Sequence, residues 1–268
     1  MTQTTMVPQR TRAKIPARTL RTDPWWRAPA VTATALTIWV LYATVHVFLG
    51  RWYWVPQYHY LTPFYSPCVS GACAPGSSSL GTWFPKVPSI VPYAIVSLPF
   101  VLGFRLSCYY YRRAYYRAFW QAPPACAVRE PHARYTGETR FPLILQNLHR
   151  YFFYLVVLIS VLNTYDAVQA FHGKTGGVGF GLGTLVIVVN VVLLWAYTLS
   201  CHSCRHITGG RLKHFSNHPV RYWIWTQVSK INARHMQLAW ITLGTLMLTD
   251  LYILLVASGA ISDLRFFN

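Results

Sequence analysis

Residues 186–198 read VIVVNVVLLWAYT, and residues 199–210 continue directly as LSCHSCRHITGG. The apolar run belongs to a segment over 178–200, which is long enough to cross a bilayer because crossing needs about 20 mostly apolar residues. The residues that follow include Cys201, Cys204 and His206, and cysteine and histidine are common metal ligands. This stretch therefore predicts a membrane-spanning helix that ends in a metal-binding group.

The composition places the whole chain among multi-span membrane proteins. Hydrophobic residues make up 53% of the 268 residues and charged residues only 11%, whereas about a quarter of the residues in soluble domains are charged. Pro99 should kink the second apolar run. We expect an all-α integral membrane protein, a bundle of five transmembrane helices with spans at about 29–49, 88–107, 150–170, 178–200 and 236–258.

Positive charge is concentrated on one side of the predicted membrane. Twenty of the 24 Lys and Arg residues lie in the N-terminal tail, or beside and between spans two and three and spans four and five. Basic residues accumulate on the cytoplasmic side, so we expect a cytoplasmic N-terminus and an outside C-terminus. The same rule accounts for the net charge of +18 without a nucleic-acid partner. The predicted parts are a cytoplasmic tail, 1–27, and a transmembrane anchor domain, 28–268.

The predicted outer loop, 51–87, contains the sequence CVSGAC. Its two cysteines, Cys68 and Cys73, flank a Ser-Gly pair that suits a turn. On the oxidising side of a membrane, such a pair favours a disulfide over two free thiols.

The depth of each candidate ligand in the membrane decides which residues can meet. Cys201 and Cys204 follow span four at the cytoplasmic side, and His149 and His235 begin spans three and five from that side. A Cys-x-x-Cys pair on the reducing side favours metal binding over a structural disulfide. Two thiolates and two imidazoles suit either a Cys₂His₂ zinc site or a Rieske-type [2Fe–2S] cluster.

The end of the fourth span determines which histidines are available. If its helix continues to about residue 205, Cys201 and Cys204 share one face, and His149 and His235 complete the site. If the helix ends at Cys201, His206 can turn toward the thiols, because the two glycines that follow permit a turn. The candidate ligands are therefore Cys201, Cys204, His149, His235 and His206.

Several motifs together resemble a known family. They are NLHRYFFYLVVL (147–158), YTLSCHSCRH (197–206), NHPVRYW (217–223), NARHMQLAW (232–240) and TDLYILLVASG (249–259). In this order they are similar to the membrane-anchor subunit, SdhC, of the actinobacterial type of succinate dehydrogenase, which is respiratory complex II. The specific resemblance covers about residues 145–268, and the remainder agrees in its general architecture.

The resemblance implies a place in a larger enzyme of a bacterial plasma membrane. A flavoprotein subunit with covalent FAD would oxidise succinate, and an iron–sulfur subunit would dock on the cytoplasmic face. The anchor would hold a Rieske-type [2Fe–2S] cluster in place of a b haem and pass electrons to menaquinone. By this resemblance Cys201 and Cys204 are cluster ligands, and His149, His235 and His206 are the candidates for the remaining positions.

A quinone needs an apolar slot near the cluster and one or two hydrogen-bond donors. Candidates at a suitable depth are Arg150, Tyr222, Trp223 and Trp240. Asp250 is a carboxylate inside span five, so it is either a functional group, or a residue that forms a hydrogen bond to a neighbouring helix or lies close to the outer interface. Two other functions compete with the cluster: a b haem held by His149 and His235, or a zinc-stabilised membrane scaffold without a redox role.

Overall fold

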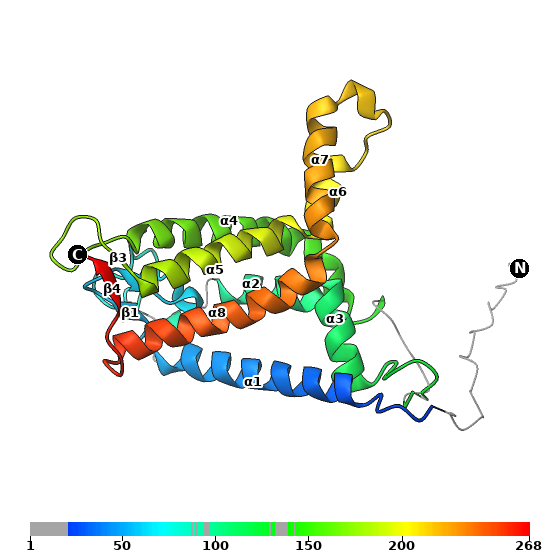
Figure 1. Ribbon diagram of the computed structural model, residues 1–268, viewed down its shortest axis with the longest axis horizontal. Coiled ribbons are helices and arrows are strands. Elements are labelled where there is room, and N and C mark those ends of the chain that lie inside the picture. Colours follow the sequence, from blue (N-terminus) through cyan, green and yellow to red (C-terminus); the bar gives the residue numbers. More distant parts are fainter. Residues whose placement is uncertain are drawn as a thin grey trace, which may run out of the picture.

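The computed structural model describes residues 21–86, 88, 91–93, 97–128, 130–131, 139–141 and 143–268. Figure 1 shows long helices that run along one common axis, with short strands and the C-terminus at one end and helices α3, α6 and α7 at the other. Most of the predicted tail 1–27 and part of the predicted second span lie outside the described residues.

Four helices in the described part of the chain are long and apolar enough to cross a membrane. They are α1 (Arg27–Leu49), α4 (His149–Gln169) with the 3-10 helix Leu143–Leu148 before it, α5 (Leu182–Leu199) and α8 (His235–Ala257). They match four of the five predicted spans to within a few residues at most ends. The chain is therefore a multi-span helical membrane protein.

The remaining predicted span, 88–107, contributes one short helix among the residues described there, α2 (Leu98–Ser107). Its ten residues extend over about 15 Å, which is half of the hydrocarbon thickness of about 30 Å. The expected kink at Pro99 is wrong, because Pro99 lies in the first turn of α2. A proline there loses no helical hydrogen bond and so begins a helix without bending it.

Shorter elements extend from both ends of the bundle. The end where α1 begins carries α3 (Tyr109–Tyr115) with its π-helical continuation Tyr116–Trp120, α6 (His202–Gly209), the 3-10 helix Phe215–Asn217 and α7 (Pro219–Asn232). Figure 1 shows α3 and α7 running across the direction of the bundle. At the other end are a 3-10 helix, Pro63–Tyr65, and two antiparallel strand pairs, β1 (Trp54–Val55) with β2 (Tyr60–Leu61) and β3 (Phe180–Gly181) with β4 (Arg265–Phe267).

Helix α5 packs between α4 and α8, and α2 packs against α4. Where lipid surrounds a bundle, close packing of side chains holds the helices together, since lipid is as apolar as the side chains themselves. Gly183 at the start of α5 lies close against β2, because a Cβ atom there would clash with the ring of Tyr60. The packing of α5 between α4 and α8 places the first residues of those two helices beside the end of α5.

Helix α1 is joined to α8 by polar contacts inside the bundle. The Trp39 indole donates to the carbonyl of Leu243 at 3.2 Å, and the Tyr42 hydroxyl donates to Oδ2 of Asp250 at 2.7 Å. His46 Nδ1 contacts the same carboxylate oxygen, and Asp250 is fully buried. The intramembrane carboxylate is thus the partner of a neighbouring helix, which was one of its expected roles.

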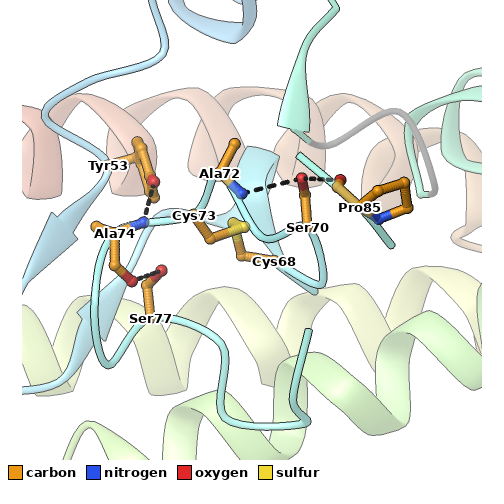
Figure 2. The surroundings of a disulfide bond; sticks show 8 residues. All are labelled: Tyr53, Cys68, Ser70, Ala72, Cys73, Ala74, Ser77 and Pro85. Carbon is orange, nitrogen blue, oxygen red and sulfur yellow. Dashed lines mark hydrogen bonds between the residues drawn. A yellow bond between two sulfur atoms is a disulfide. The ribbon is translucent and has the colours of Figure 1, made fainter. Parts of the chain in front are cut away.

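The segment after α1 closes the end of the bundle where α1 ends, and its predicted disulfide is confirmed between Cys68 and Cys73. Figure 2 shows the hydrogen bonds around this small ring: Ala72 N–H donates to Ser70 Oγ at 3.2 Å, and the Ser70 hydroxyl donates to the carbonyl of Pro85 at 3.0 Å. Ala74 N–H donates to the Tyr53 hydroxyl at 2.7 Å. The disulfide ring is therefore anchored to the loop on both sides.

Replacing Asp250 should loosen the attachment of α1. In Asp250→Leu, the Tyr42 hydroxyl and the His46 imidazole lose their acceptor in an apolar environment, at a cost of about 1–3 kcal/mol for each buried group. Asp250→Asn keeps one acceptor oxygen and should lose less stability. Thermal unfolding of the purified complex measures both losses, and hydrogen exchange of α1 locates them. An unchanged unfolding temperature for Asp250→Leu contradicts this account.

Candidate metal centre

The helix that carries the Cys-x-x-Cys pair ends before it. Helix α5 stops at Leu199, Ser200 forms its C-cap, and α6 begins at His202. Cys201 lies between the two helices in an extended conformation, with φ −63° and ψ 146°, and its sulfur accepts a hydrogen bond from Ser203 N–H. Of the two predicted endings, the structure has the early one, and Cys201 and Cys204 do not continue one helical face of α5.

Cys201 lies against the histidine that begins α4. The distance between Cys201 Sγ and His149 Nε2 is 3.0 Å. The other ring nitrogen of His149, Nδ1, lies 2.8 Å from Ser107 Oγ at the end of α2. The Phe104 ring stacks on the imidazole at 4.8 Å with an interplanar angle of 4°. His149 is thus held on three sides by residues of α2 and the α5–α6 junction.

The histidine that begins α8 has a second, equivalent set of contacts. His235 Nε2 lies 3.5 Å from the sulfur of Cys108, and His235 Nδ1 lies 2.7 Å from Ser200 Oγ. The Tyr197 ring stacks on His235 at 5.1 Å with an interplanar angle of 4°. Cys108 is therefore a candidate ligand that the sequence analysis missed.

The two sets of contacts come from a repeated pentapeptide. Residues 104–108 read FRLSC and residues 197–201 read YTLSC, so aromatic ring, serine and cysteine have the same spacing in both. Both cysteines precede a helix in a similar extended conformation. Figure 1 shows the α2–α3 and α5–α6 junctions at the same end of the bundle as the starts of α4 and α8. This repeat, together with a histidine at the start of a later span, is the sequence signal that identifies Cys108.

In the two copies of the pentapeptide, 104–108 and 197–201, the cysteine and the other residues contact different histidines. In each copy, the aromatic residue and the serine contact the histidine that follows in the chain, which is His149 for the first copy and His235 for the second. Each cysteine contacts the histidine of the other copy. The site is therefore complete only when both copies are in place.

The serines determine which nitrogen of each imidazole carries the hydrogen. The Ser107 hydroxyl donates to the carbonyl of Gly103 at 2.5 Å, and the Ser200 hydroxyl donates to the carbonyl of Tyr197 at 2.8 Å. Because each hydroxyl has only one hydrogen, its oxygen is left to accept N–H from the Nδ1 atom of histidine. Each Nε2 then presents a lone pair toward sulfur. Metal-ligating histidines are oriented by this kind of second hydrogen bond.

The thiols are buried in surroundings that favour their neutral form. The pKa of Cys201 is raised to about 12, mainly by burial and to a smaller extent by the nearby Cys108, while the hydrogen bond from Ser203 N–H lowers it. Burial also raises the pKa of the Cys108 thiol, while the positive charge of Arg105 lowers it. A bound metal ion removes the proton from a coordinating thiol. A bound metal would therefore convert the two thiols to thiolate ligands, and the two Nε2 atoms would bind through their lone pairs.

The four side chains form two separate Cys–His pairs. Within the described parts of the chain, no group of three or more His, Cys, Asp or Glu side chains is gathered closely enough to hold one metal ion. By number and type, however, two cysteines and two histidines match the ligands of a Rieske-type cluster.

Two of the predicted ligands have other surroundings. Cys204 is buried in α6, and burial raises its pKa, but it belongs to neither Cys–His pair. His206 is exposed on α6, where its Nδ1 accepts a hydrogen bond from Arg150 at 2.7 Å. Because α6 starts anew after Cys201, His206 contacts Arg150 rather than a candidate ligand.

The predicted quinone residues are dispersed rather than gathered in one slot. Tyr222 and Trp223 are exposed on α7, and Tyr222 stacks on Trp225 and lies against Phe215 at a tilt. Trp240 of α8 packs against Tyr111 at 6.0 Å. Of the four, Arg150 is adjacent in sequence to a candidate ligand, and Trp240 packs beside the interior of the site.

Comparisons with known proteins agree with this architecture. The chain matches the family model described as actinobacterial succinate dehydrogenase subunit SdhC over residues 27–259. It is 69% identical to a chain in the solved structure of the Mycobacterium smegmatis Sdh1 complex in the apo form, with a TM-score of 0.90 and 98% of both chains covered. None of the curated proteins matches this chain.

Removing the serine hydroxyls should weaken metal retention. In Ser107→Ala and Ser200→Ala, the Nδ1 hydrogen of His149 or His235 loses its acceptor, and loss of such a partner typically lowers metal affinity about 10- to 100-fold. Ser160→Ala is the matched control, because Ser160 is buried in α4 and donates to the carbonyl of Val156. Metal content of the purified complex is the measurement. Equal content in all three variants contradicts the role of the serines.

Proposed function

Since this chain belongs to the SdhC subunits of actinobacterial succinate dehydrogenase, we propose that it holds a Rieske-type [2Fe–2S] cluster with Cys108, Cys201, His149 and His235 and passes electrons to menaquinone. The chain is a multi-pass subunit of a succinate dehydrogenase complex in a bacterial plasma membrane. Its partners are the flavoprotein and iron–sulfur subunits. The succinate chemistry belongs to the flavoprotein and its FAD, outside this chain.

The two Cys–His pairs are the observation that carries the proposal. Sulfur-to-nitrogen distances of 3.0 Å and 3.5 Å bring two thiols and two imidazoles together at the ends of four different helices. Rieske-type clusters take two cysteine and two histidine ligands. The resemblance to the family pointed to Cys201 and Cys204 as the thiolates, but the geometry favours Cys108 as the partner of Cys201.

The chemistry expected of the site follows from this donor set. A bound [2Fe–2S] cluster accepts and releases single electrons, and histidine ligation places its reduction potential in a range of about −150 to +300 mV, which is high for such clusters. The protein's own part is to hold the ligands in position and to exclude water. Phe104 and Tyr197 cover the two imidazoles, and Cys108, Cys201 and His235 are almost fully buried.

We also propose that the chain crosses the membrane five times, with α2 and the residues before it as the second span. The distribution of basic residues supports a cytoplasmic N-terminus and an outside C-terminus. The ligand ends of the helices then lie on the cytoplasmic side, where the iron–sulfur subunit docks. Electrons would enter the membrane at this point.

We propose that Arg150 and Trp240 donate hydrogen bonds to the quinone. Trp240 packs on Tyr111, whose hydroxyl donates to the carbonyl of Ala239 one residue earlier in α8. Arg150 follows His149 directly and is near enough to His206 to donate to it. These two positions suit donors to a quinone carbonyl better than Tyr222 and Trp223, which lie on the exposed part of α7.

Exchanging the cysteines one at a time tests the ligand set. Cys108→Ala and Cys201→Ala should each abolish the Rieske-type EPR signal and lower iron and sulfide in the purified complex. Cys204→Ala should keep both, as should the control Cys126→Ala, whose thiol is exposed. Loss of the signal in Cys204→Ala with retention in Cys108→Ala contradicts the proposed ligand set.

The same purified complex distinguishes the competing cofactors. The proposal requires two iron atoms and two acid-labile sulfides beyond those that the iron–sulfur subunit holds, and it requires that the visible spectrum have no haem band from this subunit. Zinc in place of this additional iron would support a structural scaffold instead, and a strong Soret band would support a b haem. Either result overturns the proposed cluster.

Reporter fusions at the C-terminus test the orientation. Alkaline phosphatase fused after Asn268 should be active, because that enzyme requires the oxidising outer side. Green fluorescent protein fused at the same position should be dark, because it would be exported through the same pathway. A bright fluorescent fusion with inactive phosphatase contradicts five spans with a cytoplasmic N-terminus.

A further inference from the structure

The repeated pentapeptide contains one difference in charge. The second position is Arg105 in the first copy and Thr198 in the second. Both side chains are buried, and Arg105 is only 5% exposed. An arginine inside a membrane bundle is rare and usually has a partner or a function.

Arg105 is held against aromatic residues that surround the proposed cluster ligands. Its Nη1 donates to the Tyr111 hydroxyl at 2.5 Å. Its guanidinium carbon lies 5.0 Å from the centre of the Tyr197 ring and 5.6 Å from that of Tyr111. The Tyr197 ring stacks in turn on His235. One aromatic ring therefore separates this charge from a candidate ligand.

No carboxylate supplies the countercharge of Arg105 among the residues that the structure describes. The ion pairs found there involve Asp23, Asp250 and Asp263, and none of them includes Arg105. Cation–π contacts stabilise such a charge only partly. A buried charge without an opposite charge is strongly destabilising, so a negative group is expected close to this guanidinium.

The negative group is expected at the sulfur atoms of Cys108 and Cys201, which would be thiolates when a cluster is bound. Resting on the proposed function, we propose that Arg105 is the fixed positive charge that stabilises the reduced form of the cluster at Cys108, Cys201, His149 and His235, and so raises its reduction potential. Two ferric ions, two sulfides, two thiolates and two neutral imidazoles have no net charge. One added electron gives this group one negative charge, with no proton required. Attraction to Arg105 then favours the reduced form over the oxidised one.

Neutralising Arg105 should therefore make the cluster harder to reduce. For Arg105→Gln we expect at least a tenfold decrease in the equilibrium constant for accepting an electron, which corresponds to a decrease of about 59 mV in the potential of a one-electron couple. Arg105→Lys keeps the charge and should retain most of the potential. Arg113→Gln is the control, because it removes the same charge from an exposed position on α3.

A redox titration of the intact purified complex, followed by the EPR signal, measures these potentials. Arg105→Met provides a second neutral variant with an apolar side chain for the buried position, should the glutamine variant fail to assemble. A potential that is the same in the unmodified complex and in either neutral variant overturns the role of Arg105. Absence of the Rieske-type signal from the unmodified complex overturns the proposed function itself, so the two failures are distinguishable.

Discussion

The proposed metal centre depends on the hydrogen bond between His235 and Ser200. Because Ser200 immediately precedes Cys201, the same turn of chain that orients one histidine also delivers a thiol to the other histidine, His149. The pair Ser107 and Cys108 does the same from the end of α2. These contacts form only if α2 and α5 end, and α4 and α8 begin, at the same level of the bundle.

Much of the fold could be predicted from hydropathy and charge. Long apolar helices form where the sequence has about 20 apolar residues, because a backbone in lipid must satisfy its own hydrogen bonds. The disulfide between Cys68 and Cys73 follows from local spacing and the side of the membrane. The start of α2 at Leu98 could not be predicted in this way, because hydropathy does not report where a proline such as Pro99 begins a helix.

The sequence analysis singled out three of the four side chains in the two Cys–His pairs, and the reason that it missed Cys108 is physical. Membrane depth correctly placed His149, His235 and Cys201 in one layer, because depth depends only on position along a span. Rotation of side chains about a helix axis depends on where the helix ends, and α5 ends at Leu199. The short Cys-x-x-Cys spacing drew attention to Cys204, whereas the partner thiol, Cys108, lies 93 residues before Cys201 and is related to it by the repeat.

The exchange of cysteines between the copies at 104–108 and 197–201 has a consequence for biogenesis. Neither half of the chain offers a full set of ligands during synthesis, because each copy holds its own histidine but directs its thiol at the other. A nascent chain that has inserted only α1 to α4 presents one orphan thiol and one orphan imidazole. With the proposed ligand set, the cofactor can bind only after α8 has been inserted. A bound cofactor therefore indicates that the last span is in position.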